Sequence, residues 1–493
     1  MRRGHRSVVI LVLAMIVLAG YRSARTRALP GHVDQKDIEA GVWSVEQLLE
    51  AGRILFMARF TAEDGAGRPG ATGNASPTQR PVGSAPGFTR SAGPDANSCL
   101  GCHNQPFVGG GGDFVVNVFV GPNAREPVVH SIAASEAAER GTVSIHGAGA
   151  IEMLAREITT TLHRIRADAQ VEARRIAKPV RVKLVAKGVS YGYITALPNG
   201  MLRLLEVEGI DNDLVVRPWN QKGTVTSLRT FTISAMNQHH GMQARERFGR
   251  RITGTEDFDR DGVPDELTEG DITALVVFQA ALNIPGRVLP RDEPSRRQVA
   301  RGEVLFTRTG CAECHVPEMV LDNPVFTEPG PYNLEGTLHV SEVSRPFGLD
   351  LTREIPEPRL ARRADGTVVV RAYTDLKRHR ICDAEKPFFC NEILNQGFAP
   401  TDEFITRRLW DVGNTDPYGH RGDLTLLRDA IEHHGGEARR ARLSFEALDE
   451  GEREAIISFL RSLQILPEGS AGTVQEAPPP TLPYASTRIE GNR

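Results

Sequence analysis

The sequence is poor in several features that mark common protein classes. Its one long apolar stretch, Val8 to Ala19, is shorter than the roughly 20 residues of a membrane-spanning helix. It has no basic cluster with interleaved aromatic residues, which argues against nucleic acid as a partner. The formal charge of the 493 residues is only −3, so charge alone suggests no partner. Cysteine is scarce too, because the whole chain has six.

The N-terminus has the organisation of a secretory signal peptide. Arg2 and Arg3 precede the apolar stretch, and small and polar residues follow it. A positive start before a short apolar segment is typical of a cleaved signal. We therefore predict that residues 1–28 are a signal peptide and that the mature protein is periplasmic or otherwise exported. An uncleaved membrane anchor is the alternative.

Four of the six cysteines lie in two copies of one motif, which reads CLGCH at 99–103 and CAECH at 311–315. Two cysteines two residues apart, followed at once by histidine, are the attachment pattern of c-type haem. A structural zinc site would need a second pair of ligands at comparable spacing. The sequence therefore predicts two covalently bound haem c groups, attached by Cys99, Cys102, His103, Cys311, Cys314 and His315.

The other two cysteines, Cys382 and Cys390, are eight residues apart. In an oxidising compartment such a pair is more often a disulfide than two free thiols. We predict a disulfide, with a redox-active pair of thiols as the alternative.

The chain also contains an internal repeat. Residues 52–56 (GRILF) correspond position for position to residues 302–306 (GEVLF), each within a predicted helix that begins near Ser44 or Ser295. Further on, residues 267–284 and 448–465 share the spacing of their apolar residues and of one glycine. A repeat of this length indicates a duplicated unit. Each haem motif then lies between an opening and a closing helix.

The expected fold is mainly α, with two cytochrome c-like domains and a small β-hairpin insert in the first. Asn199-Gly200 between apolar runs is typical of a hairpin. The predicted parts are a first domain (29–290) with a Gly/Pro-rich surface loop (61–96) and the β-insert (180–218), a second domain (291–467), and a disordered tail (468–493).

The sixth ligand of each haem iron has to come from elsewhere in the chain. Leu427, Ile431 and His434 share one helix face, and two glycines end that helix. We favour His434 as the ligand of the second haem, over a buried neutral histidine bonded to a backbone carbonyl. For the first haem the ligand stays open among His130, His146, Met153, His239, His240 and Met242.

Downstream of the second motif, residues 416–422 (DPYGHRG) and the helix after them resemble the bacterial di-haem cytochrome c peroxidase superfamily. The sequence is closer to its di-haem oxidoreductase branch, which residues 373–376, 409–410, 430–431, 434–438 and Phe445 resemble. The similarity covers most of 44–467 and is strongest over 300–467. In the peroxidases a methionine fourteen residues after the histidine of this motif ligates one haem. Here that position is His434, since the motif histidine is His420.

This resemblance implies a peroxidase-like oxidoreductase that passes electrons from one haem to an oxidant at the other. The donor would be a small electron-donor protein or a quinol-linked donor, and the oxidant a small molecule. A di-haem electron carrier without catalysis of its own, and a di-haem enzyme of oxygen chemistry, are the alternatives. The oligomeric state stays open.

The resemblance also suggests catalytic residues. Glu152 lies in a Gly-x-Gly-x-x-Glu segment and is the candidate acid–base group, with a surface glutamate as the alternative. Trp219 is a candidate electron relay between the haems, or simply a core residue. The residues themselves add one more candidate. Two adjacent histidines beside a glycine indicate that one of His239 and His240, with His240 preferred, faces the first haem, and surface exposure is the alternative.

Four aspartates occur at alternate and nearby positions in one short segment. Asp257, Asp259, Asp261 and Asp265 have the spacing of positions 1, 3, 5 and 9 of an EF-hand loop. Position 12 is Thr268 rather than glutamate, so the loop is not a standard EF-hand. We predict a calcium site, with an acidic solvated turn as the alternative.

Overall fold

The computed structural model describes residues 27–73, 76–79, 95–120, 137–392 and 395–478. The predicted signal peptide therefore lies outside the described residues, apart from its last two. Helix exceeds strand, at 34% against 17%, and the strands form several small sheets. The expected mainly α fold is thus correct only in part, because strands occur in both halves of the chain and not in one insert alone. No helix in these ranges is long and apolar enough to cross a bilayer.

The first unit is built on two packed helices, α3 (Val45–Met57) and α8 (Glu269–Ala281). Ser44 caps α3, and its hydroxyl accepts from the Gln47 backbone while the Gln47 side chain accepts from the Ser44 N–H. This reciprocal capping box satisfies two backbone donors that the helix leaves unpaired. The start of this helix was therefore predictable from sequence. A short helix, α2 (Gln35–Glu39), packs on α8.

The second unit repeats this arrangement with α9 (Glu293–Arg308) and α12 (Glu450–Ser462). The start predicted near Ser295 is wrong by a few residues. Asp292 is the N-cap, and its carboxylate accepts from the backbone N–H of Ser295. Pro294 sits in the first turn, where its missing N–H costs no hydrogen bond.

One glycine contact shows that the two helix pairs are equivalent. A Cβ on Gly52 would collide with the carbonyl oxygen of Ala274, and a Cβ on Gly302 would collide with that of Ala455. The helices of each pair therefore cross in backbone contact at matching points of the repeat. This supports the internal duplication, while the domain boundaries remain predictions.

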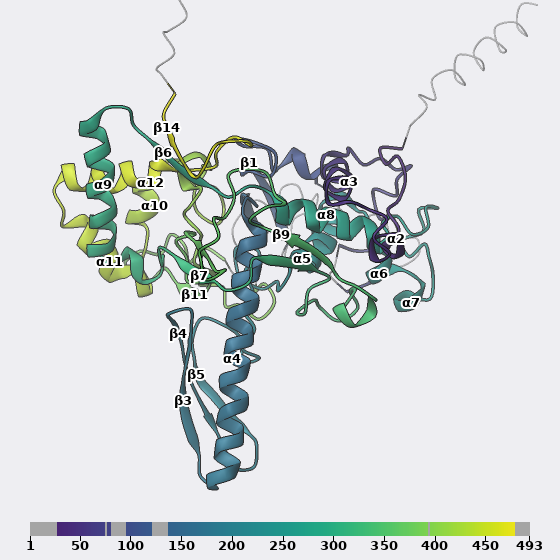
Figure 1. The fold of residues 1–493 in the computed structure, drawn as a ribbon, viewed down its shortest axis with the longest axis horizontal. Coiled ribbons are helices and arrows are strands. Elements are labelled where there is room, and N and C mark those ends of the chain that lie inside the picture. The colour runs from purple at the N-terminus through teal and green to yellow at the C-terminus, as the bar shows by residue number, and fades with distance from the viewer. Residues whose placement is uncertain (1–26, 74–75, 80–94, 121–136, 393–394, 479–493) are drawn as a thin grey trace, which may run out of the picture.

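An arm projects from the body of the molecule (Figure 1). It consists of the outer part of α4 (Ala148–Ile176) and an antiparallel sheet of β3 (Val180–Ala186), β4 (Val189–Ala196) and β5 (Leu202–Val207). The sheet confirms the predicted hairpin, with its turn between β4 and β5, and adds a third strand. A small cluster of alanines, Ala169, Ala173 and Ala196, lies between helix and sheet.

The remaining strands pair locally or join the two units. The local antiparallel pairs are β1 (Gly112–Val120) with β2 (Ala137–Thr142), β7 (Met319–Leu321) with β10 (Val368–Val370), β8 (Val325–Glu328) with β9 (Phe347–Asp350), and β11 (Arg378–Arg380) with β12 (Glu403–Ile405). In the joining sheet, β6 (Gly286–Leu289) lies between β13 (Leu463–Gln464) and β14 (Val474–Glu476). The disordered tail predicted from residue 468 is therefore wrong where β14 forms.

The described ranges also contain several short helices. They are α5 (Leu228–Ala235), the π-helix η3 (Met236–His240), α6 (Arg245–Phe248), α7 (Arg250–Thr253), α10 (Leu427–Glu432) and α11 (Arg439–Glu446). Parts of the predicted surface loop 61–96 are not on the surface, because Asp64, Arg68 and Ala71 are buried.

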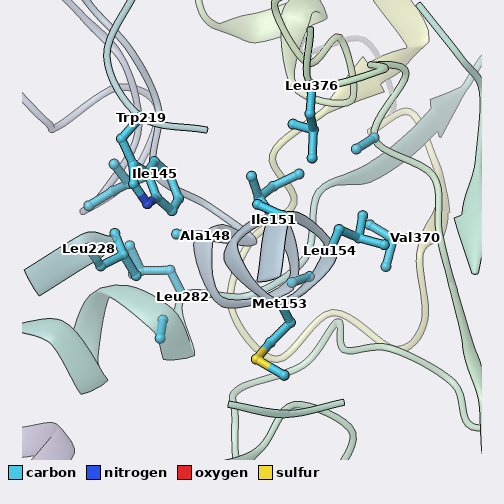
Figure 2. Packing of buried hydrophobic residues seen from close by; sticks show 14 of the residues in the cluster. Ile145, Ala148, Ile151, Met153, Leu154, Trp219, Leu228, Leu282, Val370 and Leu376 are labelled. Carbon is cyan, nitrogen blue, oxygen red and sulfur yellow. The ribbon is translucent and has the colours of Figure 1, made fainter. Parts of the chain in front are cut away.

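The hydrophobic core is continuous across the predicted boundary at residue 290. The first turns of α4 lie at its centre (Figure 2). Ile151 and Leu154 of α4 stand between Trp219 and Leu282 on one side and Val370 on the other. Because residues of both predicted units share this cluster, the two units are expected to unfold together.

Candidate haem sites

Each haem motif forms one tight turn. Cys99–Gly101 (η1) and Cys311–Glu313 (η4) are single 3₁₀ turns. The backbone N–H of His103 donates to the Cys99 carbonyl at 2.9 Å, and that of His315 donates to the Cys311 carbonyl at 3.0 Å. The two motifs thus have the same local geometry, as attachment to one kind of group requires.

The two motif histidines are also held alike. Nδ1 of His103 lies 3.2 Å from the Gly110 carbonyl, and Nδ1 of His315 lies 3.2 Å from the Tyr373 carbonyl. Donation from Nδ1 leaves Nε2 as the nitrogen that can ligate a metal. Phe56 packs against the first imidazole and Phe306 against the second, with ring centroids 6.2 and 6.4 Å apart. These phenylalanines occupy equivalent positions of the repeat.

Both motif histidines are in the form that binds iron. Burial lowers the pKa of His103 to about 4. Burial, with the nearby His434 as the next cause, lowers the pKa of His315 to about 4. Each imidazole is therefore neutral at pH 7 and keeps the lone pair that a metal ligand needs.

A cavity of about 260 Å³ adjoins the second motif. Its wall contains Cys311, Cys314, His315 and His434, together with apolar residues of both α9 and α12. Two thiols and two neutral imidazoles around a largely apolar space are the groups that a covalently bound haem requires. The residues present at this site therefore fit the predicted haem.

His434 lies where the helical pattern predicts, just beyond the end of α10. Its Nδ1 is 2.6 Å from the Ala430 carbonyl, which leaves Nε2 as the available nitrogen. Burial lowers the pKa of His434 as well. Its neighbour His433 points elsewhere and stacks on Phe388 at 4.2 Å between ring centroids. The alternative, a buried neutral histidine bonded to a backbone carbonyl, is thus correct for Nδ1 of His434. That bond still leaves Nε2 free to bind iron.

His420, the histidine of the segment 416–422, also lines this cavity but has other partners. Its Nε2 lies 2.8 Å from Oδ1 of Asn391, and its ring stacks on Phe404 at 4.2 Å. Burial lowers the pKa of His420 to about 2, and the charges of Arg140 and Lys222 add to this effect. His420 therefore belongs to a buried polar cluster at the edge of the cavity.

At the first motif, His240 is the candidate that lies against the cysteines. It ends the π-helix η3, and its Nε2 is 3.5 Å from Sγ of Cys99. Its Nδ1 lies 2.9 Å from the Ala96 carbonyl. Burial lowers the pKa of His240 to about 4. His239 turns away, with Nδ1 2.9 Å from Oδ1 of Asp95.

The other candidates for the first haem have different surroundings. Both ring nitrogens of His146 face backbone carbonyls, at 3.3 Å from Asn283 and 3.1 Å from Val108. Sδ of Met153 lies 3.8 Å from Nη1 of Arg156. Met242 is fully buried. His130 lies outside the described residues.

Glu152 is completely buried, so the alternative of a surface glutamate is wrong. Its carboxylate accepts from Arg156 at 2.6 Å, from the backbone N–H of Leu228 at 2.6 Å and from Nε1 of Trp219 at 3.3 Å. Trp219 is itself 3% exposed. The two residues proposed for catalysis are thus hydrogen-bonded to each other inside the core, and their catalytic roles stay predictions.

The segment 407–411 runs between the two motifs. Arg407 lines the cavity at the second motif. Arg408 lies near the first motif, where its charge adds to burial in lowering the pKa of His103. The Arg408 guanidinium is 5.8 Å from the Trp219 ring and donates to the Ser144 carbonyl. Its Nε has no partner within the described ranges. Burial lowers the pKa of Arg408 to about 10, so it is charged at pH 7.

Comparison with known proteins gives little to build on. No protein-family model matches the chain, and no curated protein matches its sequence. One solved structure, hydrazine synthase of Kuenenia stuttgartiensis pressurized with 20 bar xenon, is similar with a TM-score of 0.32. Identity is 14%, and the match covers 85% of this chain and 93% of that one. Similarity this low establishes neither a fold nor an activity.

The predicted disulfide between Cys382 and Cys390 is confirmed. Its loop is tied to the residues that follow His434. The carboxylate of Asp383 accepts from the backbone N–H of Gly436 at 2.6 Å, and the N–H of Gly435 donates to the Ile381 carbonyl at 2.8 Å. The disulfide loop therefore supports the position of His434.

Of the four aspartates predicted to bind calcium, the structure groups three. One carboxylate oxygen from each of Asp257, Asp259 and Asp261 lies within 4.8 Å of the others. Asp265 instead comes within 3.9 Å of Arg245. Burial, followed by the charge of Asp261, raises the pKa of Asp259 to about 7.

His379 is a residue that sequence reasoning missed. Its Nε2 is 2.8 Å from Asp375 and its Nδ1 is 2.7 Å from Glu437, beside Cys314 of the second motif. Burial alone would lower the pKa of His379, but the bonds to Asp375, Cys314 and Glu437 raise it well above its usual range. Asp375 lies in the segment 373–376, which is one of those that resemble the di-haem oxidoreductases. That resemblance could have directed attention to the residues around Asp375, including His379.

Proposed function

We propose that this chain is an exported di-haem c-type oxidoreductase with peroxidase-like activity, related to the di-haem oxidoreductases that its sequence resembles. The observation that carries the proposal is the repeated geometry of the two motifs. The same turn, the same Nδ1 bond to a carbonyl and the same phenylalanine contact occur at His103 and His315. Chance CxxCH matches would not share these surroundings.

The residues that would hold the two haems follow from this geometry. Cys99, Cys102 and His103 would bind the first haem, with His240 on its other side. Cys311, Cys314, His315 and His434 would bind the second. The haem irons would supply the one-electron chemistry. Arg407 and Arg408 are suited to the haem carboxylates. Arg407 lines the cavity at the second motif, and the buried Nε of Arg408, near the first motif, has no hydrogen-bond partner among the described residues.

The chain between the motifs would position the electron path. Trp219 contacts Arg408 on one side and Glu152 on the other, all in the interior. Because water is excluded from this region, less solvent has to reorient when an electron moves between the haems. The carboxylate of Glu152, which pairs with Arg156 at 2.6 Å, would be the acid–base group.

A second candidate function rests on the pair His240 and His434. Each motif has a buried or partly buried neutral histidine nearby, in addition to its own. If both ligate iron permanently, both haems are six-coordinate, and the chain would be an electron carrier without catalysis of its own.

Absorption and electron paramagnetic resonance spectra of the oxidised, haem-loaded protein separate these functions. A high-spin haem, or ready binding of cyanide, together with turnover of hydrogen peroxide, supports the enzyme. Two low-spin haems that bind no cyanide in either redox state, and no peroxide turnover, support the carrier. Absence of covalent haem would contradict both.

A further inference from the structure

We propose that the loop Asp257–Glu266 is a calcium site, and that the bound cation fixes the segment carrying His239 and His240. The cation binding depends only on this loop. The effect on the first haem rests on the proposed function.

The three grouped aspartates form an oxygen-only cluster. Asp257, Asp259 and Asp261 each offer one oxygen, all within 4.8 Å of one another. Asp259 is 0% exposed, and neither of its carboxylate oxygens has a hydrogen-bond partner among the described residues. An ionised carboxylate buried without a partner costs several kcal/mol, roughly, unless a cation compensates it. The structure therefore contains a buried anionic group directed into an acidic cluster.

The other two aspartates have local partners that organise the loop. Asp257 accepts from the backbone N–H of Asp261 at 3.1 Å and of Gly262 at 3.2 Å. Asp261 accepts from the backbone N–H of Val263 at 2.7 Å, while its second oxygen is buried without a partner in the described part of the chain. Hard oxygen ligands in a flexible loop suit calcium better than transition metals, and better than magnesium with its strict octahedron.

One more buried carboxylate, that of Glu266, lies near the three aspartates. Thr268 cannot serve as the ligand, because it caps α8, accepting from the Asp271 N–H and donating to the Val33 carbonyl. Glu266 is buried beside the cluster, and its Oε2 accepts from the backbone N–H of Gln243 at 2.6 Å. Gln243 follows the π-helix η3 by three residues, so this bond links the acidic loop to the segment that ends in His240.

A second link passes through the residues before the first motif. The N–H of Gly70 donates to the Asp259 carbonyl at 2.6 Å. Two residues earlier, the buried guanidinium of Arg68 donates to the carbonyls of Asn237 and Gln238, inside η3. The acidic loop is therefore connected to η3 in two places, through the bonds of Arg68 inside the helix and through Gln243 just beyond it. A cation that orders the loop would order His239 and His240 with it.

The test uses the full, haem-loaded protein after treatment with a calcium chelator and desalting. Titration with calcium chloride, followed by calorimetry, should show one cation per chain with a Kd between about 10⁻⁷ and 10⁻³ M. Calcium should raise the melting temperature, and magnesium chloride should do so less. Wild-type protein that shows neither heat nor a change in melting temperature would overturn the cation site.

Two variants and a matched control sharpen this result. Asp259→Asn and Asp261→Asn should each weaken calcium binding by about 100-fold or more. Asp259→Asn should also be at least as stable as wild type when both are free of calcium, because it removes a buried charge. Glu256→Gln is the control, since Glu256 begins this acidic stretch but pairs with Arg250 at 3.0 Å. Equal loss of binding in Glu256→Gln would contradict the assigned ligands.

The link to the first haem has its own readout. Removal of calcium should change the paramagnetic resonance signal of one haem and leave the other unchanged. The same change should occur in a Cys311→Ser/Cys314→Ser variant, which would carry only the first haem. Calcium binding without any change of either signal would overturn the link while the cation site stands. Absence of covalent haem would contradict the proposed function and leave the calorimetric result unaffected.

Discussion

The two haem motifs are alike on one side and different on the other. On the side of attachment, His103 and His315 have the same turn, the same carbonyl bond and the same phenylalanine neighbour. The two histidines that we propose as the further ligands differ, because His434 follows an α-helix, whereas His240 ends a π-helix. The duplicated helix pairs determine the attachment side, because at Gly52 and Gly302 the two helices cross so closely that a larger residue does not fit. The second side depends on loops, and loops diverge more readily.

The loops that support the two distal histidines use different chemistry. A disulfide loop is tied to the turn after His434. An acidic loop is connected to the π-helix that carries His240, through Gly70 and Arg68 and through Gln243 just beyond the helix. A covalent link depends on the redox state of the solution, whereas a carboxylate cluster depends on cations and salt. The two sites should therefore respond to different conditions, and this difference can be tested.

The largest expected effect is the loss of one haem. Replacing Cys311 and Cys314 with serine should reduce the covalent haem content from two per chain to one, and the equivalent change at Cys99 and Cys102 should do the same. Haem that resists acid–acetone extraction gives the count. If either double variant loses both haems, the two sites do not assemble independently, and the comparison between them fails.

The distal histidines should control access to the irons. His434→Ala should open the second haem to cyanide, and His240→Ala should open the first. His434→Met should raise the midpoint potential of the second haem, because methionine ligation favours the reduced iron. Cyanide titration and potentiometry measure these changes. An unchanged spectrum in His434→Ala would remove it as the ligand and make His420 the next candidate.

Glu152 lies in the core, bonded to Trp219, and should matter to stability and to turnover. Glu152→Gln leaves the buried Arg156 without its charged partner, so the free energy of unfolding should fall by about 3 kcal/mol. Both haem potentials should stay nearly unchanged, and any reaction with peroxide should slow. Denaturant unfolding and stopped-flow kinetics give the two readouts. Unchanged peroxide kinetics in folded protein would leave Glu152 a purely structural role.

The disulfide should affect the second site alone. Replacing Cys382 and Cys390 with alanine should lower the free energy of unfolding by about 2 to 3 kcal/mol, from the entropy of closing so short a loop. The second haem's signal should broaden, and the first should not change. In the native protein both thiols should resist alkylation until reductant is added. Labelling of both without reductant would contradict the disulfide.

The smallest effect concerns pH at the second site. Burial lowers the pKa of His379, but the bonds to Asp375, Cys314 and Glu437 together outweigh burial, so the pKa is raised in the folded protein. Protonated His379 therefore contributes stability that is complete below its ordinary pKa of about 6.5 and declines as pH rises toward the raised value. Between pH 6.5 and 8.5 the free energy of unfolding of wild type should fall by about 2 kcal/mol more than that of His379→Gln, because the unfolded chain loses this proton while the folded chain keeps it. Denaturant unfolding at several pH values measures this difference. The same pH dependence of the free energy of unfolding in wild type and in His379→Gln would contradict the prediction.

Features set by neighbouring residues were predictable from the sequence. The haem motifs, the capping box at Ser44, the hairpin turn and the Cys382–Cys390 disulfide all depend on short spacings. The helix face that carries His434 was predictable for the same reason. The burial of Glu152 was not, because its partners Trp219 and Leu228 are more than sixty residues away. His379 was missed because Cys314 and Glu437 approach it only in the folded chain.

The arm formed by α4 and β3–β5 has a consequence for the order of folding. Its outer contacts join Ala169 and Ala173 to Ala196, so they are local in sequence. The helix pairs of the haem units instead bring together Gly52 with Ala274 and Gly302 with Ala455. Local contacts close faster than distant ones, so the arm should gain hydrogen-exchange protection first. Each haem motif would then still be accessible to the attachment machinery, because its closing helix is translated long after it and docks last.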